Sequence, residues 1–119
     1  MQLSEAEWKV MNRVWLQHPA TAREVLSAHA DETSWAYTTV KTIMSRLVEK
    51  GALQVSMRAN TSVYEPALER GNARRTAIRS LLERAFDGAI GPMMHFLLHD
   101  KKLTKRERAM LLRMIEEEA

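Results

Sequence analysis

The chain has 119 residues, no Cys and a formal net charge of +3. This length suits one domain, or a small domain with an association element, and a hydrophobic content of 45% is that of a globular protein. The lack of Cys excludes disulfides, a thiolate nucleophile and Cys-ligated metal sites.

The sequence shows no segment that would direct the chain through a membrane. The longest nearly apolar run, residues 89–98, falls far short of the ~20 residues that span a bilayer. The N-terminus carries acidic residues where a signal peptide has cations before an apolar stretch. We therefore expect a soluble cytoplasmic protein without membrane insertion.

Two helices are predicted near the N-terminus. Ser4 and Glu7 form a capping box, and the apolar spacing behind them predicts a helix that ends before Pro19. Thr21 and Glu24 repeat the capping box and predict a second, shorter helix. A polar connector then leads to a third helical segment.

The segment 35–51, WAYTTVKTIMSRLVEKG, predicts a helix with two unlike faces. One face is apolar and is expected to enter the core: Val40, Ile43, Met44, Leu47 and Val48. The other collects short hydroxyls flanked by cations, a poor choice for helix stability alone but suited to phosphates and base edges of DNA. The predicted DNA contacts on this helix are Thr38, Thr39, Lys41, Thr42, Ser45 and Arg46. An ordinary solvated helix face is the alternative reading of this segment alone.

A β-hairpin is predicted directly behind this helix. Gly51 ends the helix, the period of the apolar residues then changes from 3.6 to 2 over residues 53–58, and residues 62–65 return after a turn at residues 58–61. Three helices closed by a hairpin predict a winged helix-turn-helix, mainly α with a small β-hairpin, whose third helix enters the major groove. Arg58 and Asn60 at the tip of the hairpin are further predicted DNA contacts.

The positive charge is concentrated where DNA contact is expected. Residues 1–68 hold seven cations and seven anions, so this part is neutral as a whole. Within 38–64, however, Lys41, Arg46, Lys50 and Arg58 face the single anion Glu49. A locally focused potential of this kind attracts a polyanion more effectively than a diffuse charge.

Residues 69–119 are predicted to form helices that associate with a second copy. Their apolar stripes exceed what three short helices can bury, and a third capping box, Thr104 with Glu107, opens the last helix. We predict a winged-helix domain over 1–68 and a helical dimerisation region over 69–119. The predicted interface consists of Ile78, Leu81, Leu82, Phe86, Met93, Met94, Phe96, Leu97, Met110, Leu111, Met114 and Ile115. Packing of these residues against the chain's own N-terminal domain is the alternative.

No catalytic arrangement is evident. His95 and His99 have the i, i+4 spacing of a metal pair, but Phe96 stands where a metallopeptidase motif needs Glu, and no third ligand is evident. We therefore expect no enzyme, no cofactor and no metal site. Five arginines between residues 70 and 84 are expected to be solvated, with contact to flanking DNA as the alternative.

Two motifs resemble a known family. The pattern W-x-x-x-T-V-x-T-x-x-x-R-L-x-x-K-G, from Trp35 to Gly51, and the opening LSEAEWKVMNRVW are similar to those of the penicillinase-repressor family (BlaI/MecI/CopY type). The resemblance extends over residues 3–115. It implies a homodimeric winged-helix transcriptional repressor that binds an inverted-repeat operator before antibiotic-resistance or stress-response genes.

The resemblance also implies roles for individual residues. Thr39, Lys41, Thr42 and Arg46 match the family's recognition helix, and Arg58 lies in the wing. In the antibiotic-responsive branch, a membrane-bound metallopeptidase sensor triggers cleavage of the repressor, and the bond that is cut there aligns with His95 and Phe96 of this chain.

Two other functions fit the same elements. A winged helix can bind proteins instead of DNA. It can also respond to a small molecule, here one bound among the C-terminal helices with residues 89–98 as the lining. Salt-dependent, sequence-selective binding of a duplex separates the first alternative from a repressor, and loss of DNA binding on adding a ligand, without proteolysis, identifies the second.

Overall fold

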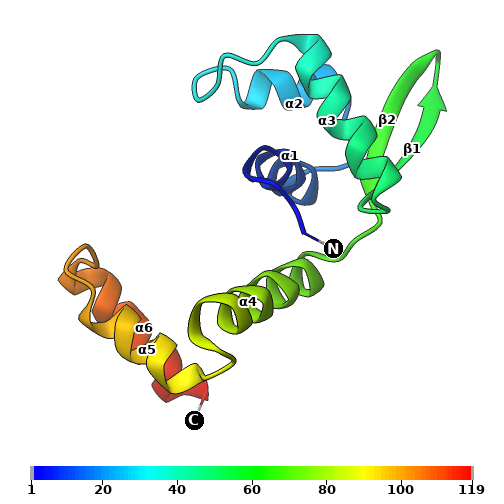
Figure 1. Ribbon diagram of the computed structural model, residues 1–119. Coiled ribbons are helices and arrows are strands. Elements are labelled where there is room, and N and C mark those ends of the chain that lie inside the picture. Colours follow the sequence, from blue (N-terminus) through cyan, green and yellow to red (C-terminus); the bar gives the residue numbers. More distant parts are fainter. Residues whose placement is uncertain (1, 119) are drawn as a thin grey trace. The chain divides into compact units, whose positions relative to one another are not determined.

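The computed structural model describes the backbone of residues 2–118 and the side chains as far as residue 113. The chain divides into two compact units, Met1–Thr76 and Ala77–Ala119. Figure 1 shows helices in both units and a hairpin in the first. Within the described residues no helix is long and apolar enough to cross a bilayer.

The first unit contains three helices and a two-stranded antiparallel sheet. The elements are α1 (Glu5–Leu16), α2 (Ala22–Ala28), α3 (Tyr37–Glu49), β1 (Leu53–Arg58) and β2 (Thr61–Pro66). The strands pair from Leu53 with Pro66 to Arg58 with Thr61, and Ala20 forms a bridge with Tyr64 that ties the hairpin to the segment before α2. This order confirms the predicted winged helix.

All three predicted capping boxes are present. In the first, the Ser4 N–H donates to Glu7 Oε1 at 2.7 Å and the Glu7 N–H donates to Ser4 Oγ at 3.1 Å. The same reciprocal pairs join Thr21 with Glu24 and Thr104 with Glu107. The backbone hydrogen bond from Thr21 lowers the pKa of Glu24, and the one from Thr104 lowers the pKa of Glu107. These pairs satisfy backbone donors that a helix start leaves without partners.

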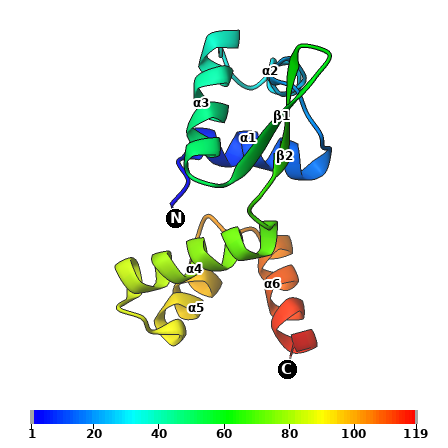
Figure 2. The same cartoon turned by 90° about the vertical axis from the view of Figure 1, so that its right-hand side faces the viewer.

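The core of this unit forms around the apolar face of α3. Val40, Met44 and Leu47 are fully buried and Ile43 is nearly so. They belong to one cluster with residues of α1, α2 and the hairpin: Val10, Met11, Val14, Val25, Leu53 and Tyr64. Figures 1 and 2 show α3 along one side of this unit, and it contacts α1, α2 and β1 directly. Full burial of each such side chain is worth about 1.5–3 kcal/mol, so the orientation of α3 is strongly fixed.

The hairpin reaches beyond this core. Leu53 at its base is buried, whereas Val55 is partly exposed and Met57 is 63% exposed. The predicted strand is present, but its burial does not alternate: Leu53 is buried, and the five residues of β1 that follow it are exposed. Ala59 and Asn60 turn the chain with φ values of 47° and 65°, the positive pair that a two-residue hairpin turn of type I′ requires.

The second unit has few buried side chains. The boundary between the units falls within α4 (Arg70–Phe86), which is followed by α5 (Ile90–His99) and α6 (Lys105–Glu118). Among the described residues after Thr76, Met93 is the one buried hydrophobic side chain. The rings of Phe86 and Phe96 lie 6.1 Å apart and join α4 to α5.

An ion pair between the exposed Lys50 and the buried Glu7 connects the end of α3 to the start of α1. Lys50 Nζ donates to Glu7 Oε1 at 2.7 Å and to the Gln2 carbonyl oxygen at 3.0 Å, and Glu7 is only 4% exposed. Burial by itself would raise the pKa of Glu7, but hydrogen bonds from Lys50 and from Ser4, with the Lys50 charge, lower it below its ordinary 4.5. Glu7 therefore joins the capping box of α1 to the end of α3.

We predict that Glu7→Gln lowers the free energy of unfolding by about 1–3 kcal/mol, because Gln retains the capping box but leaves Lys50 without its counter-charge. A lowered folded pKa means that the stabilisation is present above the unfolded pKa and is lost as the pH falls through the folded pKa. The difference from wild type in urea unfolding should therefore shrink below about pH 4.5. Glu5→Gln, an exposed neighbour, is the control and should unfold like wild type. A difference that persists undiminished in acid would contradict this assignment.

Candidate nucleic-acid interface

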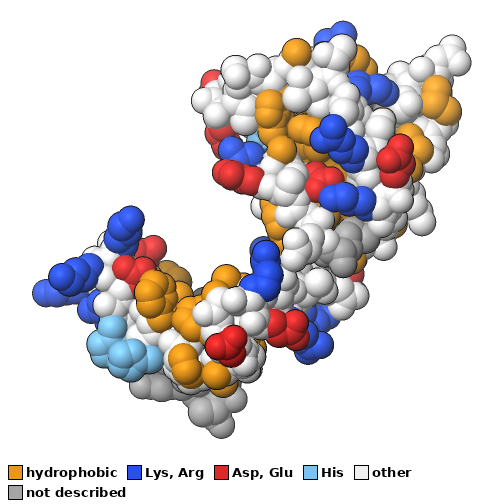
Figure 3. Space-filling view, in the orientation of Figure 1, with side chains coloured by type: hydrophobic (Ala, Val, Ile, Leu, Met, Phe, Trp, Pro, Cys, Tyr) orange, Lys and Arg blue, Asp and Glu red, His pale blue; other side chains and the backbone are white. Residues whose placement is uncertain are grey.

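The outer face of α3 is a continuous exposed surface of short polar side chains. Thr38, Thr39, Thr42, Ser45 and Arg46 are all exposed. They occupy the side of the helix opposite the buried Val40, Met44 and Leu47. Figure 3 shows Lys and Arg side chains over this part of the first unit. The structure thus brings five of the six predicted contacts on this helix to one solvent-facing surface.

The Thr42 hydroxyl is already engaged within the helix. Its Oγ1 donates to the Thr38 carbonyl oxygen at 2.9 Å. This bond uses the hydroxyl proton and leaves the oxygen lone pairs and the methyl group outward. Thr42 can therefore accept a hydrogen bond from a base or pack on a thymine methyl group, but it is a poor donor to phosphate.

The N-terminus of α3 has no side-chain cap. Its N-cap is Ala36, whose side chain makes no capping hydrogen bond. The first N–H groups of a helix have no intrahelical acceptor, and the helix dipole adds positive potential at this end. Thr38 lies inside the helix, with its side chain exposed.

The cations near α3 differ in availability. Arg46 is exposed, and among the described residues it forms no ion pair, neither with Glu49 nor with Glu5. Lys50 was expected to add to the positive potential, but its bonds to Glu7 and Gln2 commit it to the fold. Lys50 therefore adds less to the potential around α3 than the composition of residues 38–64 indicates.

Lys41 lies between α3 and the hairpin. It is half-buried, and its Nζ donates to the Tyr64 hydroxyl at 3.4 Å and lies 5.9 Å from the centroid of that ring. It also lines a hollow of about 320 Å³ with Asn60 from the tip of the hairpin. In Figures 1 and 2 the hairpin tip and the start of α3 lie at the same end of the unit. Arg58 is exposed on the hairpin but does not line this hollow.

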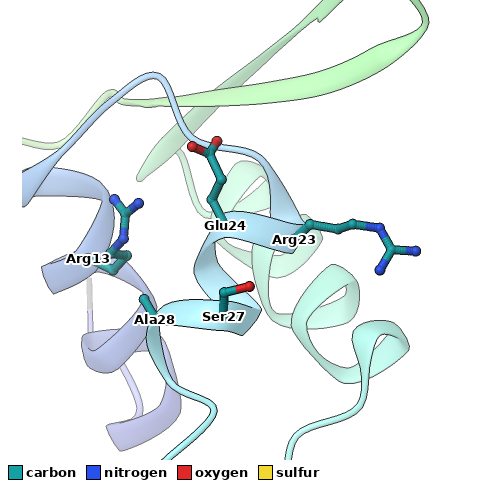
Figure 4. Close-up of a pocket in the computed structure, with 5 residues that line it drawn as sticks. All are labelled: Arg13, Arg23, Glu24, Ser27 and Ala28. Carbon is teal, nitrogen blue, oxygen red and sulfur yellow. The ribbon is translucent and has the colours of Figure 1, made fainter.

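Arg23 and Tyr37 also line this hollow, and neither was among the predicted contacts. Arg23 on α2 places its guanidinium 4.7 Å from the centroid of the Tyr37 ring, at the first turn of α3. Figure 4 shows Arg23 projecting away from the pocket side where Arg13 and Glu24 lie. Helical spacing on α2 alone gives no sign of this contact, because it depends on how α2 packs against α3.

The predicted dimerisation residues form a largely exposed apolar surface in the second unit. Ile78, Leu81, Phe96, Leu97 and Met110 are exposed, with Ile78 at 56% and Phe96 at 57%. Leu82, Phe86, Met94 and Leu111 are half-buried, and Met93 is buried inside the unit. Figure 3 shows hydrophobic side chains on the visible face of this unit. Met114 and Ile115 lie outside the described side chains.

His95 and His99 lie side by side on α5. Their rings stack with centroids 4.2 Å apart, and His99 Nδ1 is 2.8 Å from the His95 carbonyl oxygen. Among the described residues no group of three or more His, Cys, Asp or Glu is placed to hold a metal ion. Both His95 and Phe96, the predicted cleavage residues, are exposed within the helix.

Three of the five arginines of α4 interact with other groups of the chain. Arg70 lies over the Trp15 ring at 5.7 Å, Arg75 bonds the Asn72 side chain, and Arg84 donates to the Ser80 carbonyl oxygen. Arg74 and Arg79 are exposed. Arg70 thus helps to anchor the start of α4 beside Trp15, whose indole N–H donates to the Leu68 carbonyl oxygen at 2.9 Å.

An exposed hydroxyl-rich helix beside a wing is the geometry of a winged-helix repressor, and the comparison with known families agrees. The family model described as penicillinase repressor matches residues 3–117. The chain belongs to the penicillinase repressor family. This family consists of transcriptional repressors and not of enzymes, which confirms both the resemblance seen in the sequence and the expected absence of an enzyme function.

Three similar proteins illustrate how far the match extends. A penicillinase repressor of Bacillus licheniformis is 28% identical over 116 residues, which are 98% of this chain and 91% of that protein. The solution structure of Bacillus licheniformis BlaI in its monomeric form with the blaP half-operator matches 60% of this chain and 88% of that chain, with 29% identity and a TM-score of 0.52. Staphylococcus aureus MarR shares the fold alone: 10% identity and a TM-score of 0.55 over 97% of this chain and 70% of that chain.

The structure predicts that removing one of two cations on α3 and its C-terminal cap leaves the stability nearly unchanged, whereas removing the other lowers it. Arg46→Ala should change the free energy of unfolding by less than about 0.5 kcal/mol, because Arg46 is exposed and has no ionic partner in the described part of the chain. Lys50→Ala should lower it by about 1–3 kcal/mol, because it leaves the Glu7 carboxylate buried without its cation. Urea unfolding followed by circular dichroism measures both. Equal losses in the two variants would show that Arg46 has a structural role.

Proposed function

We propose that the chain is a DNA-binding transcriptional repressor that acts as a homodimer on an inverted-repeat operator of antibiotic-resistance or stress-response genes. The observation that carries the proposal is the exposed face of α3, opposite its buried face and beside the hairpin tip. In a winged helix this face enters the major groove while the wing lies along the backbone.

The side chains on α3 differ in chemistry and therefore suit different parts of the DNA. Arg46 is free to form a bidentate contact with guanine or to bind phosphate, and the Thr42 methyl group suits thymine. Thr38 and Thr39 lie in the first turn, close to the open helix end where phosphate oxygens are attracted. Ser45 adds a hydroxyl in the same row. Arg58 and Asn60 serve as backbone contacts from the wing.

Dimerisation is supported by the apolar surface of the second unit. Several large side chains are exposed, whereas few are buried among the described residues of that unit. Exposed apolar surface of this extent marks an interaction site, and a two-fold symmetric pair matches a palindromic operator. The functional division into residues 1–68 for DNA and 69–119 for dimerisation is part of this proposal.

Release from DNA by proteolysis completes the proposal. Cleavage between His95 and Phe96 would divide α5 and separate the DNA-binding unit from the proposed dimer contacts that follow residue 95, which leaves the interface incomplete. Both residues are exposed, but they lie within a helix, so a membrane-bound metallopeptidase sensor, or a protease that it activates, requires local unwinding of α5. Intact protein in cells whose repression has been lifted would contradict this step.

The central test is selection of bound fragments from genomic DNA by the full chain. We expect recovery of an inverted repeat, and an affinity that falls steeply with salt. Arg46→Ala should weaken binding to that site by about tenfold or more, since a good bidentate contact contributes about 1–3 kcal/mol. Recovery of no specific sequence would overturn the proposed function and would favour a protein-binding winged helix.

We predict that the chain sediments as a dimer at micromolar concentration and that Leu81→Asp weakens this dimer by at least about tenfold, because a charge is then buried without a partner at the interface. Thr76→Asp is the control, since it adds the same charge at an exposed polar position of α4. Its sedimentation should match that of wild type. A wild-type monomer at this concentration would contradict the proposed dimer.

A further inference from the structure

The hollow between α2, α3 and the hairpin tip has the chemistry of an anion site. It is lined by Thr21, Ala22, Arg23, Tyr37, Lys41, Asn60, Thr61 and Ser62. Two of these eight residues are cations, none is acidic, and all the others except Ala22 add hydroxyl or amide donors. The three elements that enclose it are the ones that a winged helix uses on DNA.

Arg23 is held in place for this role. Its guanidinium lies 4.7 Å from the centroid of the Tyr37 ring, and stacking on an aromatic face restricts where its donors point. The neighbouring Glu24 forms no ion pair with it among the described residues: the Glu24 carboxylate accepts the Thr21 N–H at 2.8 Å, and Glu24 lines a second hollow together with Arg13 and with Arg23 itself. Figure 4 shows that Arg23 extends away from Glu24 and Arg13.

Lys41 is oriented toward the same hollow. Its stem is half-buried against the hairpin, and its ammonium group keeps two donors after the bond to the Tyr64 hydroxyl. A side chain in this position is less suited to reading base edges than the exposed residues of α3. The hollow thus combines the planar guanidinium of Arg23 from α2, the ammonium group of Lys41 from α3 and the Asn60 amide from the wing.

We propose that this hollow seats one phosphate of the DNA backbone in each half-site, with Arg23 and Lys41 as its charged contacts and Asn60 as its contact from the wing. The inference rests on the proposed function and deepens it, because it assigns to Arg23 a contact outside the recognition helix. One phosphate held by three elements fixes the depth and register of α3 in the groove. Tyr37 acts as a positioning residue for Arg23.

The test uses the full chain and the duplex recovered by selection. Arg23→Gln should weaken binding by about tenfold, and the slope of log affinity against log salt should fall by about 0.9 for each half-site. The preferred sequence should not change, because a phosphate carries no base information. Tyr37→Leu should weaken binding by about two- to fivefold by freeing Arg23. Arg13→Gln is the matched control: it removes the same charge from a residue that does not line the proposed phosphate hollow, and its binding should equal that of wild type.

Single methylphosphonate substitutions in the duplex locate the contact. We expect one phosphate in each half-site whose neutralisation weakens binding of wild type and of Arg13→Gln but not of Arg23→Gln. Arg23→Gln with the affinity and salt slope of Arg13→Gln, or with a changed base preference, would overturn the phosphate seat alone. A wild-type chain that binds no duplex selectively would overturn the proposed function itself.

Discussion

Burial of the apolar face of α3 is the constraint on which the rest of the structure depends. Val40, Met44 and Leu47 fill the centre of the first unit, and the side chains of α1, α2 and the hairpin gather around them. Because a helix with one face fixed in a core has its other face fixed in solvent, the row of threonines becomes a rigid surface without any further device. The Lys50 bond to Glu7 and the Gly51 turn, with φ of 83°, hold the far end of the same helix.

Placement of charge, more than its amount, distinguishes the DNA-binding surface. Lys50 is used inside the fold and Arg70 lies against Trp15, so neither adds to the potential that DNA meets at α3. Arg46 and Arg58 remain exposed, and Arg23 joins them from α2. The neutral composition of residues 1–68 therefore conceals an uneven distribution, in which anions such as Glu7 and Glu24 cap helices and several cations face outward.

Local patterns in the sequence predicted most of the first unit. Capping boxes and helical period depend on residues three or four apart, so Ser4, Thr21 and the faces of α3 could be placed without knowledge of the fold. The Lys50 to Glu7 bond and the Arg23 to Tyr37 contact join elements distant in sequence, and no spacing rule reports them. The exposure of Met57 was also beyond prediction, because a period of two tells which residues share a face but not where the core beneath that face ends.

The second unit carries the surface through which we propose that two copies of the chain associate. Its exposed leucines and phenylalanine suit a symmetric interface. When one half-site is bound, the second copy of α3 is held close to the other half-site, so the dimer would bind the whole operator more tightly than either half-site alone.

Binding to duplexes whose half-sites are moved apart tests this pairing most directly. Insertion of about five base pairs turns one half-site to the opposite side of the helix, and we expect affinity to fall to that of a single half-site; insertion of about ten should restore part of it. Affinity that is indifferent to the insertion would contradict the claim that α3 acts in pairs.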